Sequence, residues 1–152
     1  MISMANMIEA IAGKKILVDT NIIIYLTDAI QPFAERAQSL FEMIESGDSE
    51  AVISILSIGE VMQGPIRNNR SDLALEAMEY LTNFPNCHCQ EITHEVLAYV
   101  ANDSRIAWNS LRAMDSLIIA SGLANKVDLF ISNDKHFKKA LQKDLLLTFD
   151  ET

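Results

Sequence analysis

Short, mainly apolar runs alternate with helical patterns along this chain, and this alternation constrains the fold more than any other feature. The runs over 15–18, 51–56 and 128–132 have the composition of buried strands, and each ends at or beside a polar residue. Between them, apolar residues recur every three or four positions, as in an amphipathic helix. Strands that alternate with helices form a parallel sheet with helices on both faces. The sequence therefore predicts an α/β fold.

The same patterns predict the remaining elements. Pro32 and Gly47 bracket one helix, Gly64 and Pro65 end another, and Thr93 caps a third. The expected helices cover 22–26, 33–47, 57–64, 71–81, 93 to beyond 100, 114–125 and 134–140; further strands cover 88–92 and 145–148, and a polar turn covers 66–70.

The chain has the size and apolar content of one domain. It has 152 residues, of which 49% are hydrophobic, and this is enough for a substantial core. We expect a single domain over 1–152, with its core at about 15–148 and a helical N-terminal extension over 1–14.

Acidic side chains outnumber basic ones by 21 to 12, which gives a formal net charge of -9. This balance excludes a generally basic nucleic-acid coat, but an acidic total also arises when carboxylates gather to hold cations. No apolar run approaches the roughly 18 residues of a membrane span. Lys14 and Lys15 follow the apolar N-terminal part, the reverse of the order in a signal peptide. We expect a cytoplasmic protein with no membrane partner.

Cys87 and Cys89 flank His88, but no second cysteine pair completes a zinc site. Residues two apart in a strand share a face. We therefore interpret the two cysteines as small apolar side chains that pack on one face of a strand.

Four acidic residues follow predicted strands or open the helices after them: Asp19, Glu60, Asp115 and Asp134. In open α/β sheets, ligands bind outside the carboxyl ends of the strands. Each acid also has a structural interpretation, because Asp19 and Asp134 are placed as helix N-caps and Asp115 suits the positive end of a helix dipole. Ser57 and Glu60 have the spacing of a capping box. Capping alone, however, does not require all four acids to lie at one edge of the sheet.

Four carboxylates at one edge need a cation, because two unit charges 4 Å apart repel by about 4 kcal/mol at an effective dielectric constant near 20. Oxygen ligands without a cluster of His or Cys favour Mg²⁺ or Mn²⁺ over zinc. Such ions bind phosphate oxygens and activate water. The four acids therefore predict a nuclease.

Four motifs resemble those of PIN-domain ribonucleases. They are 18–21 (VDTN), 57–60 (SIGE), 114–120 (MDSLIIA) and 131–137 (ISNDKHF), and they occur in the family's order over most of 15–148. A chain of this size is most similar to the VapC toxins of bacterial and archaeal toxin-antitoxin pairs. The resemblance implies a three-layer α/β/α sandwich with a five-stranded parallel sheet, and cleavage of RNA that depends on Mg²⁺ or Mn²⁺.

The resemblance also implies a role for each site residue. Asp19 and Asp115 would bind the metal directly, Asp134 directly or through water, and Glu60 through water or by orienting water. Asn21 and Ser132 would hold the acids in position. A VapC-like protein would also form a homodimer and be silenced by a VapB-type antitoxin.

An acidic protein must bind RNA through local positive charge. The candidate phosphate contacts are Arg67, Arg70, Arg105, Arg112, Lys135, Lys138 and Lys139. Among them, the lysines after Asp134 adjoin a proposed metal ligand.

Two alternatives remain open. The first is a Mg²⁺-dependent phosphatase or receiver domain of similar α/β form. Phosphatases with an aspartyl nucleophile, however, need a second Asp two residues after the first, where this chain has Asn21, and receiver domains need paired acids after the first strand, which this chain lacks. The other alternative is a catalytically silent PIN-like module that binds RNA or protein, and such modules usually lose one or more of the acids, whereas this chain has all four.

Overall fold

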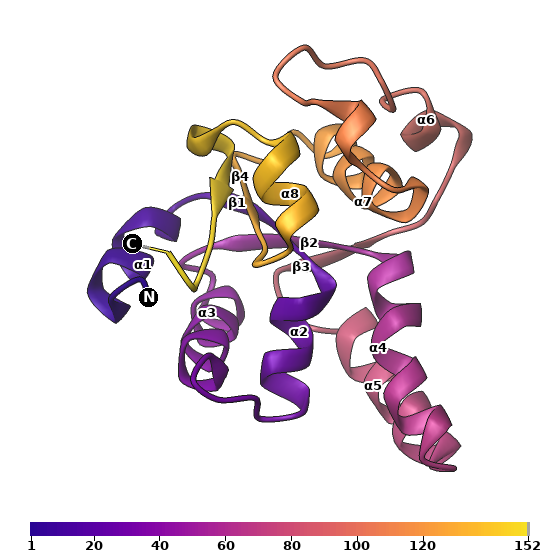
Figure 1. Cartoon of the computed structure of the whole chain (residues 1–152). Helices are drawn as coiled ribbons and strands as arrows, with labels where there is room; N and C mark the ends of the chain where they lie inside the picture. Colours follow the sequence, from indigo (N-terminus) through magenta and orange to yellow (C-terminus); the bar gives the residue numbers. More distant parts are fainter. Residues whose placement is uncertain (152) are drawn as a thin grey trace.

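The computed structural model describes residues 1–151, and its centre is a five-stranded sheet (Figure 1). The strands are β1 (Lys15–Val18), β2 (Glu50–Ser54), β3 (Cys87–Gln90), β4 (Leu129–Ile131) and β5 (Leu146–Leu147). Their order is β3-β2-β1-β4-β5, and every neighbouring pair is parallel. The carboxyl ends of all five strands therefore lie at one edge, as expected for the predicted parallel sheet.

Helices cover both faces of the sheet. They are α1 (Met4–Ile11), α2 (Thr20–Thr27), α3 (Ala34–Ser46), α4 (Ile55–Arg67), α5 (Ser71–Thr82), α6 (His94–Leu97), α7 (Ala113–Ala124) and α8 (Lys135–Ala140), with 3₁₀ turns η1 (Trp108–Ser110) and η2 (Lys143–Leu145). In Figure 1, α7 and α8 lie above the sheet, and α2 and α3 lie below it. This is the predicted three-layer α/β/α sandwich.

Two apolar clusters hold the three layers together. Ile16 and Val18 of β1 point into one cluster, with α1 to α5, while Leu17 points into the other, with α7 and α8. All three side chains are fully buried. Because successive strand residues face opposite sides, a sheet covered on both faces requires the continuous apolar run that the sequence shows.

α4 begins earlier and ends later than its sequence pattern predicted. β2 ends at Ser54, whose side chain caps the amide of Leu56 at 3.2 Å, so the helix begins at Ile55 and not at Ser57. It also passes through Pro65 to Arg67, so the predicted turn over 66–70 is too long. A proline lacks an amide donor but keeps its carbonyl acceptor, and here the Pro65 carbonyl accepts from the Arg70 amide at 2.8 Å.

The helix after Thr93 is shorter than predicted. The Thr93 side chain caps it by accepting from the Val96 amide at 3.2 Å, as expected, but α6 ends at Leu97. The amides of Tyr99 and Val100, beyond its end, bond three residues back, and Ala101 has a φ of 63°, which breaks the helical path.

The N-terminal helix and the cysteine strand both pack on the first cluster. Met7 and Ile11 of α1 are fully buried there, and the Ile2 amide bonds to the Phe149 carbonyl at 3.0 Å. Cys87 and Cys89 pack on the same cluster, as predicted, and burial raises the pKa of Cys87 to about 12. Within residues 1–151, no helix is long and apolar enough to cross a membrane.

Gly122 tests the close packing of α7 on the sheet. A Cβ added there would lie 2.6 Å from Cε1 of the buried Phe130 ring and 3.2 Å from Cβ of Leu17. We expect Gly122→Ala to lower the free energy of unfolding by about 1–3 kcal/mol, measured by urea denaturation. Gly59→Ala on α4, where a Cβ meets nothing within 4 Å, is the control and should leave stability unchanged or slightly raised. Equal effects of the two variants would contradict this packing.

Candidate functional site

The structure brings the four predicted acids to the carboxyl edge of the sheet. Asp19 follows β1 and caps α2, and Asp134 follows the neighbouring strand β4 and caps α8. Asp115 lies in the first turn of α7. Glu60 lies in the second turn of α4 and is exposed, and its negative charge acts on Asp19. The capping roles of Asp19 and Asp134 are real, and they coexist with the clustering.

Asp19 is the buried centre of this edge and is only 4% exposed. Its Oδ1 accepts from the Thr20 amide at 2.8 Å, and its Oδ2 accepts from the Ser132 hydroxyl at 2.6 Å and the Asn21 amide group at 3.0 Å. Burial raises the pKa of Asp19 to about 6, against the lowering effect of these hydrogen bonds. The nearby charges of Asp134 and Glu60 contribute to this rise in pKa, so the carboxylate is held in place but short of positive charge.

Ser132 and Asn21 link Asp19 to the loop after β4. The Ser132 oxygen accepts from the Asp134 amide at 3.0 Å and from Asn21 Nδ2 at 3.1 Å. Asn21 Oδ1 in turn accepts from the Asn133 amide at 3.0 Å. One buried hydroxyl therefore fixes the spacing of the two acid-bearing loops.

Thr20, which is not among the predicted site residues, positions Glu60. The Thr20 hydroxyl donates to Glu60 Oε1 at 2.9 Å and lies 2.9 Å from Ser57 Oγ. Ser57 is fully buried inside α4, and the cap of this helix is Ser54, so the capping-box interpretation of Ser57 and Glu60 is wrong. Their spacing of three residues was a usable signal, because it puts both side chains on one face of a helix.

Asn133 is a second residue that the sequence analysis passed over. Its Nδ2 donates to the Tyr25 hydroxyl at 3.2 Å, and its Oδ1 accepts from the Phe149 amide at 2.7 Å. It therefore ties the loop that carries Asp134 to α2 and to the C-terminal segment. Its position between Ser132 and Asp134 was the only sequence signal.

Arg112 lies against two of the acids. Its Nε is 2.8 Å from Asp115 Oδ2, and its Nη2 is 3.1 Å from Asp115 Oδ1 and 3.4 Å from Asp134 Oδ2. The Asp115 side chain is 7% exposed, whereas that of Arg112 is 62% exposed. A predicted phosphate contact is thus the present counter-ion of the site.

Three of the other predicted phosphate contacts are engaged elsewhere. Lys138 Nζ lies 2.6 Å from Asp150 Oδ2, and Arg70 pairs with Asp72 at the start of α5 at 2.9 Å. Arg105 pairs in the same way with Asp103 at 2.7 Å.

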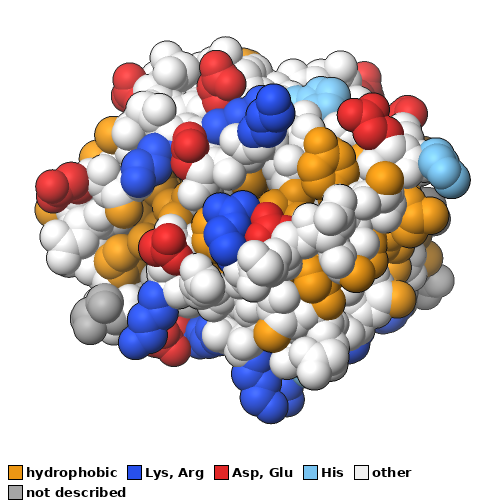
Figure 2. Space-filling view, turned by 90° about the horizontal axis from the view of Figure 1, so that it is seen from above, with side chains coloured by type: hydrophobic (Ala, Val, Ile, Leu, Met, Phe, Trp, Pro, Cys, Tyr) orange, Lys and Arg blue, Asp and Glu red, His pale blue; other side chains and the backbone are white. Residues whose placement is uncertain are grey.

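Three further cations are exposed. Lys135 directly follows Asp134, and Lys139 lies one turn further along α8. Arg67 ends α4, about 10 Å along the helix axis from Glu60. Figure 2 shows basic side chains scattered among acidic and apolar ones on the face seen from above, without one large basic field.

The donor set at this edge fits a hard divalent cation in its chemistry, because it consists of carboxylates supported by hydroxyl and amide groups. As the side chains stand in residues 1–151, no three His, Cys, Asp or Glu groups are close enough to hold one ion together. The guanidinium of Arg112 contacts both oxygens of Asp115, so a cation that uses this carboxylate competes with it.

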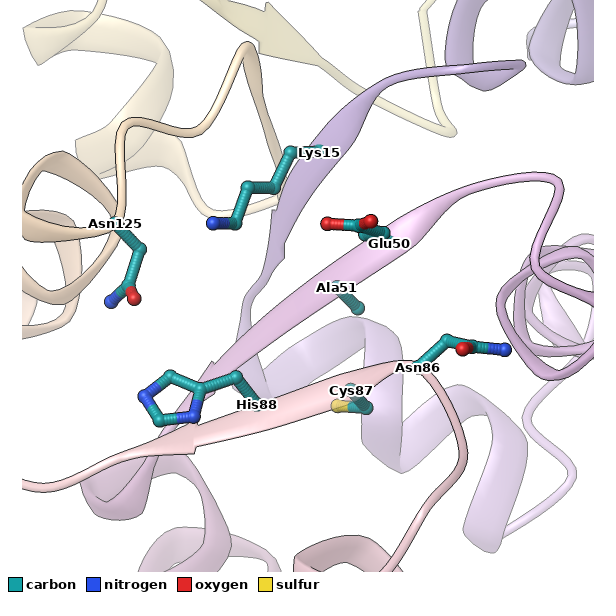
Figure 3. Close-up of a pocket in the computed structure, with 7 residues that line it drawn as sticks. All are labelled: Lys15, Glu50, Ala51, Asn86, Cys87, His88 and Asn125. Carbon is teal, nitrogen blue, oxygen red and sulfur yellow. The ribbon is translucent and has the colours of Figure 1, made fainter.

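A hollow of about 470 Å³ lies at the opposite edge of the sheet (Figure 3). Lys15, Glu50 and Cys87, which begin three neighbouring strands, line it together with His88 and Asn125. It is therefore separate from the four acids, and Thr20, Asn21 and Ser132, which support Asp19, do not line it.

The raised pKa of Asp19 predicts a stability difference that depends on pH. A buried carboxyl whose pKa rises from 3.8 to about 6 holds its proton better in the folded chain, so its stabilising effect is present below pH 3.8 and is lost as the pH rises through 6. We expect wild type to lose about 3 kcal/mol relative to Asp19→Asn between pH 4 and 7. Urea denaturation in EDTA at several pH values measures this difference, and parallel pH profiles would contradict it.

Solved structures of known proteins share this fold. VapBC2 of Rickettsia felis bound to a promoter DNA fragment has a TM-score of 0.62 at 14% identity, over 90% of this chain and 99% of that one. A toxin-antitoxin complex of Klebsiella pneumoniae has a TM-score of 0.60 at 22% identity, over 87% and 95%. VapC20 of Mycobacterium tuberculosis, a toxin that cleaves the sarcin-ricin loop, has a TM-score of 0.60 at 16% identity, over 82% and 93%.

No curated protein sequence matches this chain. The family model of the PIN domain, in contrast, matches residues 16–142, which include the central strand and all four acids. The chain therefore belongs to the PIN-domain family.

Proposed function

We propose that this protein is a metal-dependent endoribonuclease that hydrolyses RNA phosphodiester bonds and acts as the toxin of a VapBC-type pair. The observation that carries the proposal is the retention of all four acids at one edge, around a buried Asp19 that Ser132 and Asn21 hold by hydrogen bonds. A silent binding module has no need of a buried carboxylate near like charges, because such a group lowers stability unless a cation joins it.

The residues at this edge would hold Mg²⁺ or Mn²⁺. Asp19 and Asp115 are the proposed direct ligands, Asp134 is a direct or water-mediated ligand, and Glu60 acts through water. A bound divalent ion activates a water and offsets negative charge on the scissile phosphate.

The chain itself supplies orientation. Ser132 contacts both Asp19 and the backbone of Asp134, so it keeps these two carboxylates in register. Glu60, held by Thr20, is exposed and free to orient the attacking water. Lys135 and Arg112 stand beside the acids, where they would contact the RNA phosphates on either side of the cleaved bond.

The proposed partners are an RNA substrate, a VapB-type antitoxin and a second copy of the chain. The toxin-antitoxin and VapBC complexes among the structural relatives support the antitoxin. An RNA substrate and an antitoxin both imply activity in the cytoplasm.

Loss of either central carboxylate should abolish RNA cleavage. We expect Asp19→Asn and Asp115→Asn to lower the cleavage rate of a mixed RNA pool at least about 100-fold, because each removes a charged ligand. Gel analysis with Mn²⁺, Mg²⁺ or EDTA measures this loss, and cleavage should require the metal. The control is Asp28→Asn, at the other end of α2, which should keep full activity.

A folded, metal-binding, antitoxin-free protein that cuts none of many varied RNAs would overturn the nuclease proposal. It would favour the silent RNA- or protein-binding module instead.

Ser132 should act through the acids it holds. Ser132→Ala removes the hydrogen bond to Asp19 and the acceptor for the Asp134 amide, so we expect Mn²⁺ to bind roughly 10–100-fold more weakly. Cleavage should recover at high Mn²⁺ concentration. Ser121→Ala, at a buried serine of α7 whose hydroxyl donates to the Leu117 carbonyl in its own helix, is the control. Unchanged Mn²⁺ affinity in Ser132→Ala would refute this positioning role.

A further inference from the structure

Arg112 makes its side-chain bonds to the acids of the site. Its guanidinium faces both oxygens of Asp115, at 2.8 and 3.1 Å, and reaches Asp134 at 3.4 Å. The Arg112 backbone amide adds a longer bond of 3.3 Å to Asp115 Oδ2. A two-pronged Arg–carboxylate pair of this kind is among the stronger interactions of a protein surface.

The Asp115 carboxylate is available from few directions. Its side chain is 7% exposed, so burial leaves little of this carboxylate open, and the Arg112 guanidinium contacts both of its oxygens. Direct coordination of a cation by Asp115 therefore competes with the present Arg112 pairing, because both need the same two oxygens and both bring positive charge to them.

We propose that Arg112 is a built-in counter-ion that competes with the divalent cation, so that metal binding and the release of Arg112 from Asp115 are one coupled event. This inference rests on the metal site of the proposed function. In the metal-free chain the guanidinium offsets the repulsion between Asp115 and Asp134, and a divalent ion takes over that task.

The release of Arg112 is structurally easy. Its side chain is 62% exposed and has a long flexible stem, so it can turn outward without disturbing the core. The freed guanidinium stays at the edge of the sheet, where it can bind a phosphate with the same two-pronged geometry. The competition therefore weakens the binding of the ion but leaves a phosphate contact in place once the ion has bound.

The affinity for Mn²⁺ tests the competition without RNA. We expect Arg112→Gln to bind Mn²⁺ roughly tenfold more tightly than wild type, measured by the EPR signal of free Mn²⁺, because one charge-assisted pair no longer has to break. The matched control is Arg70→Gln, since Arg70 also precedes a helix and pairs through two bonds with an Asp in its first turn. Its Mn²⁺ affinity should equal that of wild type.

A second measurement follows the arginine itself. In protein labelled with ¹⁵N-arginine, the Nε resonance of Arg112 is identified as the one that is missing in Arg112→Gln. Mg²⁺ should shift this resonance and leave that of Arg70 in place. Equal or weaker Mn²⁺ binding by Arg112→Gln than by wild type, or an Arg112 resonance that ignores Mg²⁺, would overturn the competition while leaving the nuclease proposal intact. If neither wild type nor Arg112→Gln binds Mn²⁺ or Mg²⁺, the metal site of the proposed function falls, and the competition falls with it.

Discussion

The hydrogen bond from Ser132 to Asp19, 2.6 Å long, is the contact on which the rest of the site depends. It exists because β1 and β4 are neighbours in the sheet, with Val18 opposite Ile131, so the residues after each strand meet at the same edge. The Asp19 amide reinforces this register by bonding to the Ile131 carbonyl at 3.0 Å. Asn21, Asp134 and Thr20 are all held relative to this pair.

The same edge carries an electrostatic conflict that burial sharpens. Asp19 is almost fully buried, and its pKa is raised to about 6, in part because the nearby carboxylates of Asp134 and Glu60 oppose its ionisation. Hydrogen bonds to Ser132, Asn21 and the Thr20 amide stabilise the charged form but bring no positive charge. Arg112 brings one positive charge, on the Asp115 side. The fold thus keeps an edge that is stable enough to form and still short of positive charge, and this is where the proposed function places a divalent cation.

Local sequence patterns predicted most helices and strands of the fold. They failed where a side chain had two possible hydrogen-bond partners. The run 51–56 looked like strand throughout, yet β2 ends at Ser54 because this serine caps the next helix. Ser57 and Glu60 matched a capping box by spacing alone, but their partner is Thr20, which lies on another helix. A motif fixes which residues are available for bonding, and it does not choose between partners that only the fold brings near.

The sequence by itself determined the α/β class, the parallel sheet and the edge at which the four acids meet, because strand periodicity and chain order constrain these strongly. Only the tertiary structure decided how the acids are held. The Thr20 to Glu60 contact, the ties of Asn133 and the pairing of Arg112 with Asp115 and Asp134 depend on distances of about 3 Å between side chains. Hydrogen bonds and ion pairs are short-ranged and directional, so contacts between residues far apart in the chain become definite only when the sheet and its helices have packed.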